Sequence, residues 1–65
     1  MNDEQVLADR VEAELICGTT PTLIVAAINP CLHVQDVVSA LSRFGFNETA
    51  TRLYNAWEQQ RKAIA

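Results

Sequence analysis

Hydrophobic residues recur every three to four positions in the first part of the chain, which is the spacing of an amphipathic helix. Its apolar positions lie one turn apart, at Leu7, Val11 and Leu15. Asn2 precedes this segment as a candidate N-cap. Gly18 follows it, where helices commonly end in a left-handed residue. The pattern predicts a first helix over residues 3–17.

The next apolar segment, residues 23–28 (LIVAAI), has no polar face. Thr20 and Pro21 precede it, an arrangement typical of a helix start. A buried strand would also fit six consecutive apolar residues, but no second strand-like segment is present to pair with it. We therefore favour a short helix over residues 21–28, buried on most sides, and keep the strand as the alternative.

A third helix is predicted over residues 31–44. Its apolar stripe comprises Val34, Val37, Val38, Leu41 and Phe44, and polar residues fill the opposite side. Asn29 and Pro30 repeat the start signal of the preceding helix. Gly45 is expected to end the helix, with Leu41 touching Phe46 across the stop.

The last helix is predicted over residues 48–64, with Asn47 as its cap. One face carries Ala50, Leu53, Tyr54, Trp57, Arg61 and Ile64. The four segments together predict an all-α fold, a small bundle of short helices joined by tight turns in a single domain over residues 1–65.

The size of the chain suggests that this bundle is completed by dimerisation. A chain of 65 residues buries only about 60% of the surface that it exposes when unfolded, so its core is marginal. Scaffolds of this size usually add disulfides, a metal or oligomerisation. Whether a dimer or a higher oligomer forms is left open by the sequence.

The charge and the cysteines of the chain bear on whether it binds nucleic acid, is secreted or contacts a membrane. The net charge is −3, and the acids concentrate in the first 16 residues, where Arg10 is the single base. An acidic chain lacks the basic footprint of nucleic-acid binders. The start MNDEQ lacks the basic-then-apolar pattern of a secretory signal, and residues 23–28 are far shorter than the roughly 20 residues of a membrane span. We expect a cytoplasmic protein with reduced thiols and no membrane contact.

Residues 37–58 (VVSALSRFGFNETATRLYNAWE) resemble the LisH dimerisation motif. The matching positions are Val37, Leu41, Gly45, Phe46, Thr49, Ala50 and Leu53. Two positions depart from the family pattern, with Ala40 where an aromatic residue is usual and Ala56 where an acid is frequent. The resemblance implies a paired-helix unit that self-associates into a four-helix bundle.

The same stretch contains the candidate interface. Large side chains that remain exposed as a patch mark an association site, and Trp, Tyr and Arg are enriched in interface hot spots. The candidate residues are Val37, Leu41, Phe44, Phe46, Leu53, Tyr54, Trp57 and Arg61. We expect Trp57 to lie at the margin of the monomer's core and to be covered by a second chain. The alternative is that the first two helices cover all of these residues.

Candidate catalytic and metal-binding residues are few. His33 and Asp36 are one helical turn apart and could orient a general base, but the sequence places no nucleophile beside them. Cys17, Cys31 and His33 fall short of the four ligands of structural zinc and lack its Cys-x₂₋₄-Cys pair. We expect no enzyme activity, metal or cofactor. Cys31, predicted in the first turn of the third helix, is either a reactive thiol or, preferably, a small buried apolar residue.

The sequence therefore predicts a small non-enzymatic protein–protein interaction module. We expect it to be homodimeric and to act on a partner protein as an adaptor, regulator or inhibitor. The alternative is a helix-turn-helix-like DNA-binding regulator that uses the third helix. The polar side of that helix offers His33, Gln35, Ser39, Ser42 and Arg43. A single arginine beside Asp36 argues against this alternative.

Overall fold

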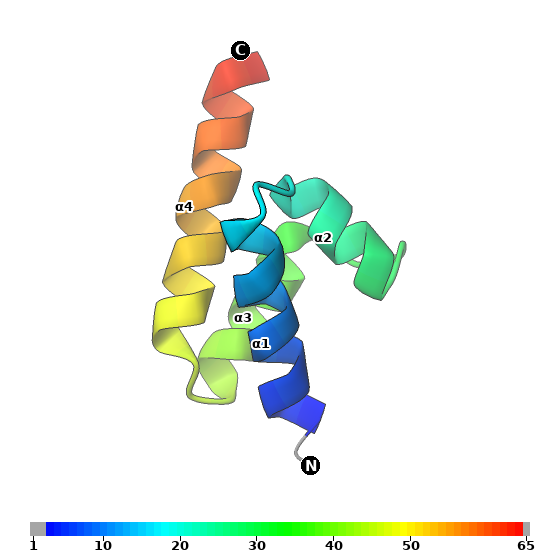
Figure 1. Ribbon diagram of the computed structural model, residues 1–65, viewed down its shortest axis with the longest axis vertical. Helices are drawn as coiled ribbons and strands as arrows, with labels where there is room; N and C mark the ends of the chain where they lie inside the picture. Colours follow the sequence, from blue (N-terminus) through cyan, green and yellow to red (C-terminus); the bar gives the residue numbers. More distant parts are fainter. Residues whose placement is uncertain (1–2, 65) are drawn as a thin grey trace.

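The computed structural model describes residues 3–64, without the side chain of Ile64. It contains four α-helices, α1 (Asp3–Ile16), α2 (Pro21–Ile28), α3 (Val34–Arg43) and α4 (Asn47–Ile64) (Figure 1). These residues include no strand, so the predicted all-α class is confirmed, and residues 21–28 are helical. The cap proposed for Asn2 lies outside the described residues. None of the four helices combines the length and the apolar character that crossing a membrane requires, within the part of the chain described.

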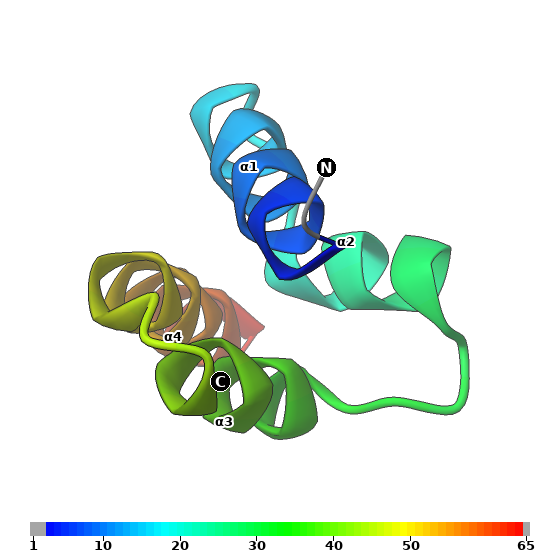
Figure 2. The same cartoon turned by 90° about the horizontal axis from the view of Figure 1, so that it is seen from below.

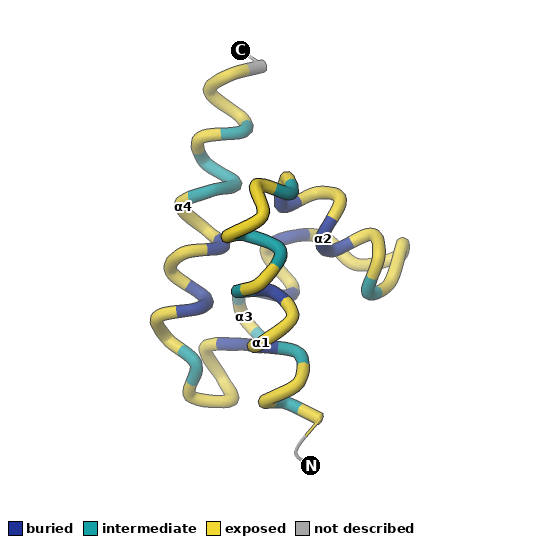
Figure 3. The backbone as a smooth tube through the Cα atoms, in the orientation of Figure 1, coloured by how far each residue is buried: buried dark blue, intermediate teal, exposed yellow. Residues whose placement is uncertain are grey.

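The helices α3 and α4 form an antiparallel hairpin, and α1 and α2 pack on it (Figures 1 and 2). The core lies where the four helices meet. Its buried apolar residues are Ala8, Val11, Ile24, Val25, Val34, Val37, Leu41, Ala50 and Leu53. The end of α4 extends beyond the other three helices (Figure 1), and side chains there are mostly exposed or half-buried (Figure 3).

Both glycines end helices as predicted. Gly45 has a φ of +95°, a left-handed conformation that L-residues with a side chain rarely adopt. The N–H of Phe46 donates to the carbonyl of Leu41 at 2.9 Å, which closes the turn between α3 and α4. Gly18 has a φ of +86° and ends α1 in the same way. These two turns set the direction in which α2 and α4 leave the preceding helices.

The predicted start of the third helix is wrong. The side-chain oxygen of Asn29 accepts a hydrogen bond from the N–H of Cys31 at 2.9 Å, and this local turn ends α2. The chain then continues through a linker without helix, residues 29–33 (Figure 2), in which the Leu32 N–H donates to the Asn29 carbonyl at 3.1 Å. The helix begins at Val34, because Asp36 accepts the N–H of His33 at 3.0 Å and so stabilises the helix start there.

The start of α4 also differs from the expectation. Asn47 is already the first helical residue, and its side-chain oxygen accepts a hydrogen bond from the Ser42 hydroxyl at 3.2 Å. The N–H of Ala50 donates to the carbonyl of Phe46 at 3.0 Å, which is an ordinary helical bond. The side chain of Asn47 therefore ties the end of α3 to the beginning of α4.

A polar contact that the sequence did not reveal joins α1 to α4. Glu12 accepts hydrogen bonds from the hydroxyl of Thr49 at 2.9 Å and from the guanidinium of Arg52 at 2.7 Å. Thr49 is buried, so its hydroxyl needs this partner. The hydrogen bond and the charge of Glu12 raise the pKa of Arg52 above its usual value. Glu12 therefore fixes α1 against the first turns of α4.

Candidate protein-interaction surface

Three of the predicted interface residues lie in the core of the single chain. Val37, Leu41 and Leu53 are buried beneath α1 and α2. A partner cannot contact them on the folded chain. The helices that lie on the α3–α4 hairpin in this structure are α1 and α2 of the same chain (Figure 2).

The other five candidate residues remain accessible, but the structure divides them between two places. Phe44 and Phe46 lie at the turn of the α3–α4 hairpin, and Tyr54, Trp57 and Arg61 lie further along α4. The helical rise from Phe46 to Trp57 is roughly 16 Å. The two groups therefore do not form one continuous site.

Tyr54, Trp57 and Arg61 form a contiguous set, which we call the aromatic–arginine cluster. The rings of Tyr54 and Trp57 lie 5.9 Å apart at an interplanar angle of 58°. The Arg61 guanidinium lies 4.8 Å from the centroid of the Trp57 ring, a cation–π geometry. Glu58 holds the other side of Arg61 at 3.3 Å. These contacts restrict the side chains of Trp57 and Arg61 in the unbound protein.

Trp57 itself lies at the margin of the core, as expected from the sequence. It is half-buried and packs against the buried cluster, whereas Tyr54 is 42% exposed. Large side chains at such a border contribute to the fold on one side and offer contact area on the other.

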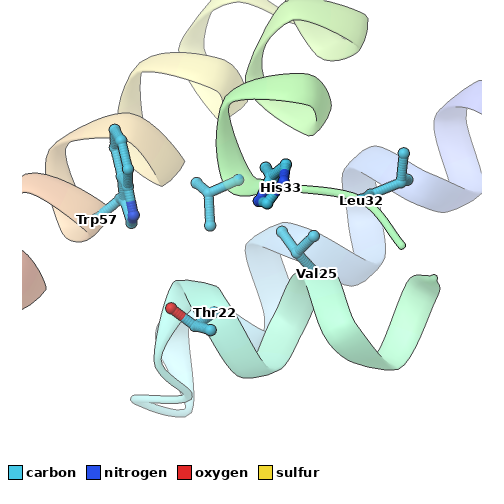
Figure 4. Close-up of a pocket in the computed structure, with 6 residues that line it drawn as sticks. Thr22, Val25, Leu32, His33 and Trp57 are labelled. Carbon is cyan, nitrogen blue, oxygen red and sulfur yellow. The ribbon is translucent and has the colours of Figure 1, made fainter. Parts of the chain in front are cut away.

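Beside Trp57 the surface is hollowed into a cleft of about 140 Å³ (Figure 4). Its lining residues are Thr22, Val25, Leu32, His33, Val34 and Trp57. Val25 and Val34 belong to the buried core and give the cleft an apolar floor. A cavity of roughly 150 Å³ holds one benzene ring. The cleft is therefore large enough for one apolar side chain of a partner.

Gln60 joins α4 to α2, two of the three helices that border this cleft. Its amide donates to the hydroxyl of Thr22 at 2.8 Å, and its carbonyl oxygen accepts the Thr22 N–H at 3.4 Å. That N–H belongs to the first turn of α2, where the helix itself offers no acceptor. Nothing in the sequence marks this pairing, because the two residues are far apart in the chain and Gln60 follows no motif.

The candidate catalytic and metal-binding residues include one hydrogen-bonded pair, His33 and Asp36, and two exposed thiols. Asp36 accepts the backbone N–H of His33, so this carboxylate stabilises the start of α3. Cys17 and Cys31 are free and exposed, and Cys31 lies in the linker. The preferred interpretation of Cys31 as a buried residue in a helix is therefore wrong. Within residues 3–64, no three His, Cys, Asp or Glu side chains gather as a metal site.

The polar side of α3 is exposed, as the DNA-binding alternative requires. The exposed residues are His33, Gln35, Ser39, Ser42 and Arg43. Asp36 is exposed among them, and Arg43 is the one basic residue of the helix. Phosphate binding depends on several cations. The helix α3 therefore offers one cation for phosphate contacts.

A scan against protein-family models found no match to this chain, and searches of curated proteins and of solved structures found none either.

Proposed function

We propose that this protein is a non-enzymatic protein–protein interaction module. It works as a homodimer and binds a partner protein as an adaptor, regulator or inhibitor. The partner contacts the aromatic–arginine cluster on α4 and inserts an apolar side chain into the adjoining cleft.

The observation that carries the proposal is the position of Trp57 between the core, the cleft and Arg61. Binding hot spots are enriched in Trp, Tyr and Arg, and they act where neighbouring contacts exclude water. Trp57 lines the cleft and stacks with Arg61 at 4.8 Å. Because the cation–π contact and the Glu58 pair already order these side chains, a partner loses less conformational entropy on binding.

Exposed apolar side chains support the homodimer. Among residues 3–63, six large hydrophobic residues are exposed, namely Val6, Ile16, Leu23, Leu32, Phe44 and Tyr54. Chains of this size commonly gain stability by oligomerisation. Association would remove part of this apolar surface from water, at roughly 25 cal/mol for each Å² buried.

The test of partner binding compares Trp57→Ala with the wild-type chain as bait. Proteins from the native cell that bind the wild type are purified, and their affinity is measured by titration calorimetry. Trp57→Ala should weaken binding by about 2 kcal/mol or more, roughly a 30-fold rise in Kd. Lys62→Ala, an exposed change on the same helix, is the matched control and should bind normally.

Circular dichroism decides whether the loss is local. The helical content of Trp57→Ala should largely survive, because Trp57 is only half-buried. If Trp57→Ala binds the purified partner as tightly as the wild type, the cluster is not the binding surface. If the variant unfolds outright and association of its residual folded fraction is unchanged, Trp57 serves the core alone and the proposal is wrong.

A further inference from the structure

One continuous part of the chain carries no formal charge. All eight acidic and five basic residues lie outside residues 15–35. This segment comprises the end of α1, all of α2 and the linker to α3. The remaining helices carry acids and bases throughout. The surface around α2 is therefore chemically distinct from the rest of the molecule.

Within this segment, α2 has an apolar side that no other part of the described chain covers. Ile24 and Val25 point into the core, whereas Leu23 is 63% exposed and Ala26 and Ala27 are exposed. Figure 3 shows buried and exposed positions alternating around this helix. The sequence predicted a helix buried on most sides, and in this respect the prediction is wrong for the single chain. A helix that is apolar all round is normally buried.

We propose that this side of α2 packs against the same side of α2 in a second copy of the chain. The α2 surface is defined by Thr22, Leu23, Ala26 and Ala27. This inference rests on the homodimer in the proposed function and assigns its contact surface. It places the self-association contact on α2, next to the partner-binding surface, and Thr22 belongs to both.

A second copy is the occupant that fits the charge pattern. In a two-fold contact the same surface meets itself, so a charged surface would bring like charges together. The residues of the α2 surface carry no formal charge. Its one hydroxyl, on Thr22, already accepts the Gln60 amide at 2.8 Å. Two copies can therefore meet here without repulsion between formal charges.

The shape of α2 favours close packing. Ala26 and Ala27 are small, so the two helices can approach closely, and Leu23 supplies the large apolar contact. A membrane surface is the poorer occupant, because membrane-bound helices use basic residues beside the apolar face. The whole chain has a net charge of −3, and residues 15–35 contain no lysine or arginine.

The experiment measures mass by sedimentation velocity at tens of micromolar for the wild type and for Leu23→Glu, Val6→Glu and Trp57→Ala. The wild type should sediment as a dimer, and Leu23→Glu as a monomer with its helical content intact. Val6→Glu makes the same kind of change at another exposed apolar residue, on α1, and should remain dimeric. Trp57→Ala should also remain dimeric.

Hydrogen exchange of the wild type gives a second measurement that does not depend on a variant's folding. Amides of residues 21–28 should exchange more slowly as the concentration rises through the dimerisation range, whereas those of residues 54–61 should change less. A dimer that survives Leu23→Glu, or one in which only residues 54–61 gain protection, overturns the assignment to α2 and leaves the homodimer standing. A monomeric wild type overturns the homodimer and this inference together.

Discussion

Replacing Gly45 tests how the hairpin that presents the aromatic–arginine cluster is built. Gly45 has a φ of +95°, and a Cβ added there would meet nothing within 4 Å. The cost of a side chain is therefore conformational and not a clash with a neighbour. The left-handed region costs an ordinary L-residue about 1–2 kcal/mol, and a β-branched residue resists it most. Gly45→Val should lower the free energy of unfolding by more than about 1 kcal/mol.

The assay is thermal and urea unfolding followed by circular dichroism. For a domain of this size, each kcal/mol lowers Tm by about 4–8 °C. Gly45→Asn is the matched control, because asparagine tolerates positive φ better than valine, so it should fall between the wild type and Gly45→Val. Gly18→Val repeats the test at a second left-handed glycine with open space around it. If Gly45→Val melts like the wild type, the turn between α3 and α4 is not the one described.

Three further predictions concern the core, the cleft and nucleic acid. Leu53→Ala removes a fully buried side chain and should cost about 2–5 kcal/mol in urea unfolding, whereas Tyr54→Ala, beside it but exposed, should cost far less. Gln60→Ala breaks the contact with Thr22 and should lower stability by about 0.5–1.5 kcal/mol, with Gln59→Ala, exposed on the same helix, as the neutral control. In a gel-shift assay at low salt, micromolar protein should not retard DNA, and clear retardation would revive the helix-turn-helix interpretation.

The helices themselves follow from local signals in the sequence. The two glycines, the apolar stripes and the Pro21 start each place an element within a few residues of its position in the structure. These features act over one or two turns, so the sequence displays them directly. The prediction that Asn29–Pro30 starts a helix was wrong, because an asparagine side chain can either cap a helix or close a local turn. Here the Asn29 side chain accepts a hydrogen bond from the Cys31 N–H and closes a turn.

The candidate site was harder to predict, because burial depends on how distant segments meet. Leu41, Leu53 and Trp57 all follow apolar stripes, yet two are fully buried and one lies at the surface of the core. Likewise, the contacts of Glu12 and Gln60 with residues far along the chain have no local pattern.

Light scattering of the wild-type chain, measured from tens of micromolar downwards, tests the proposed association most directly. We expect about twice the chain mass at the upper end, falling towards the monomer on dilution, with Tm falling in parallel. A single monomer mass throughout the range, with a constant Tm, would contradict the homodimer.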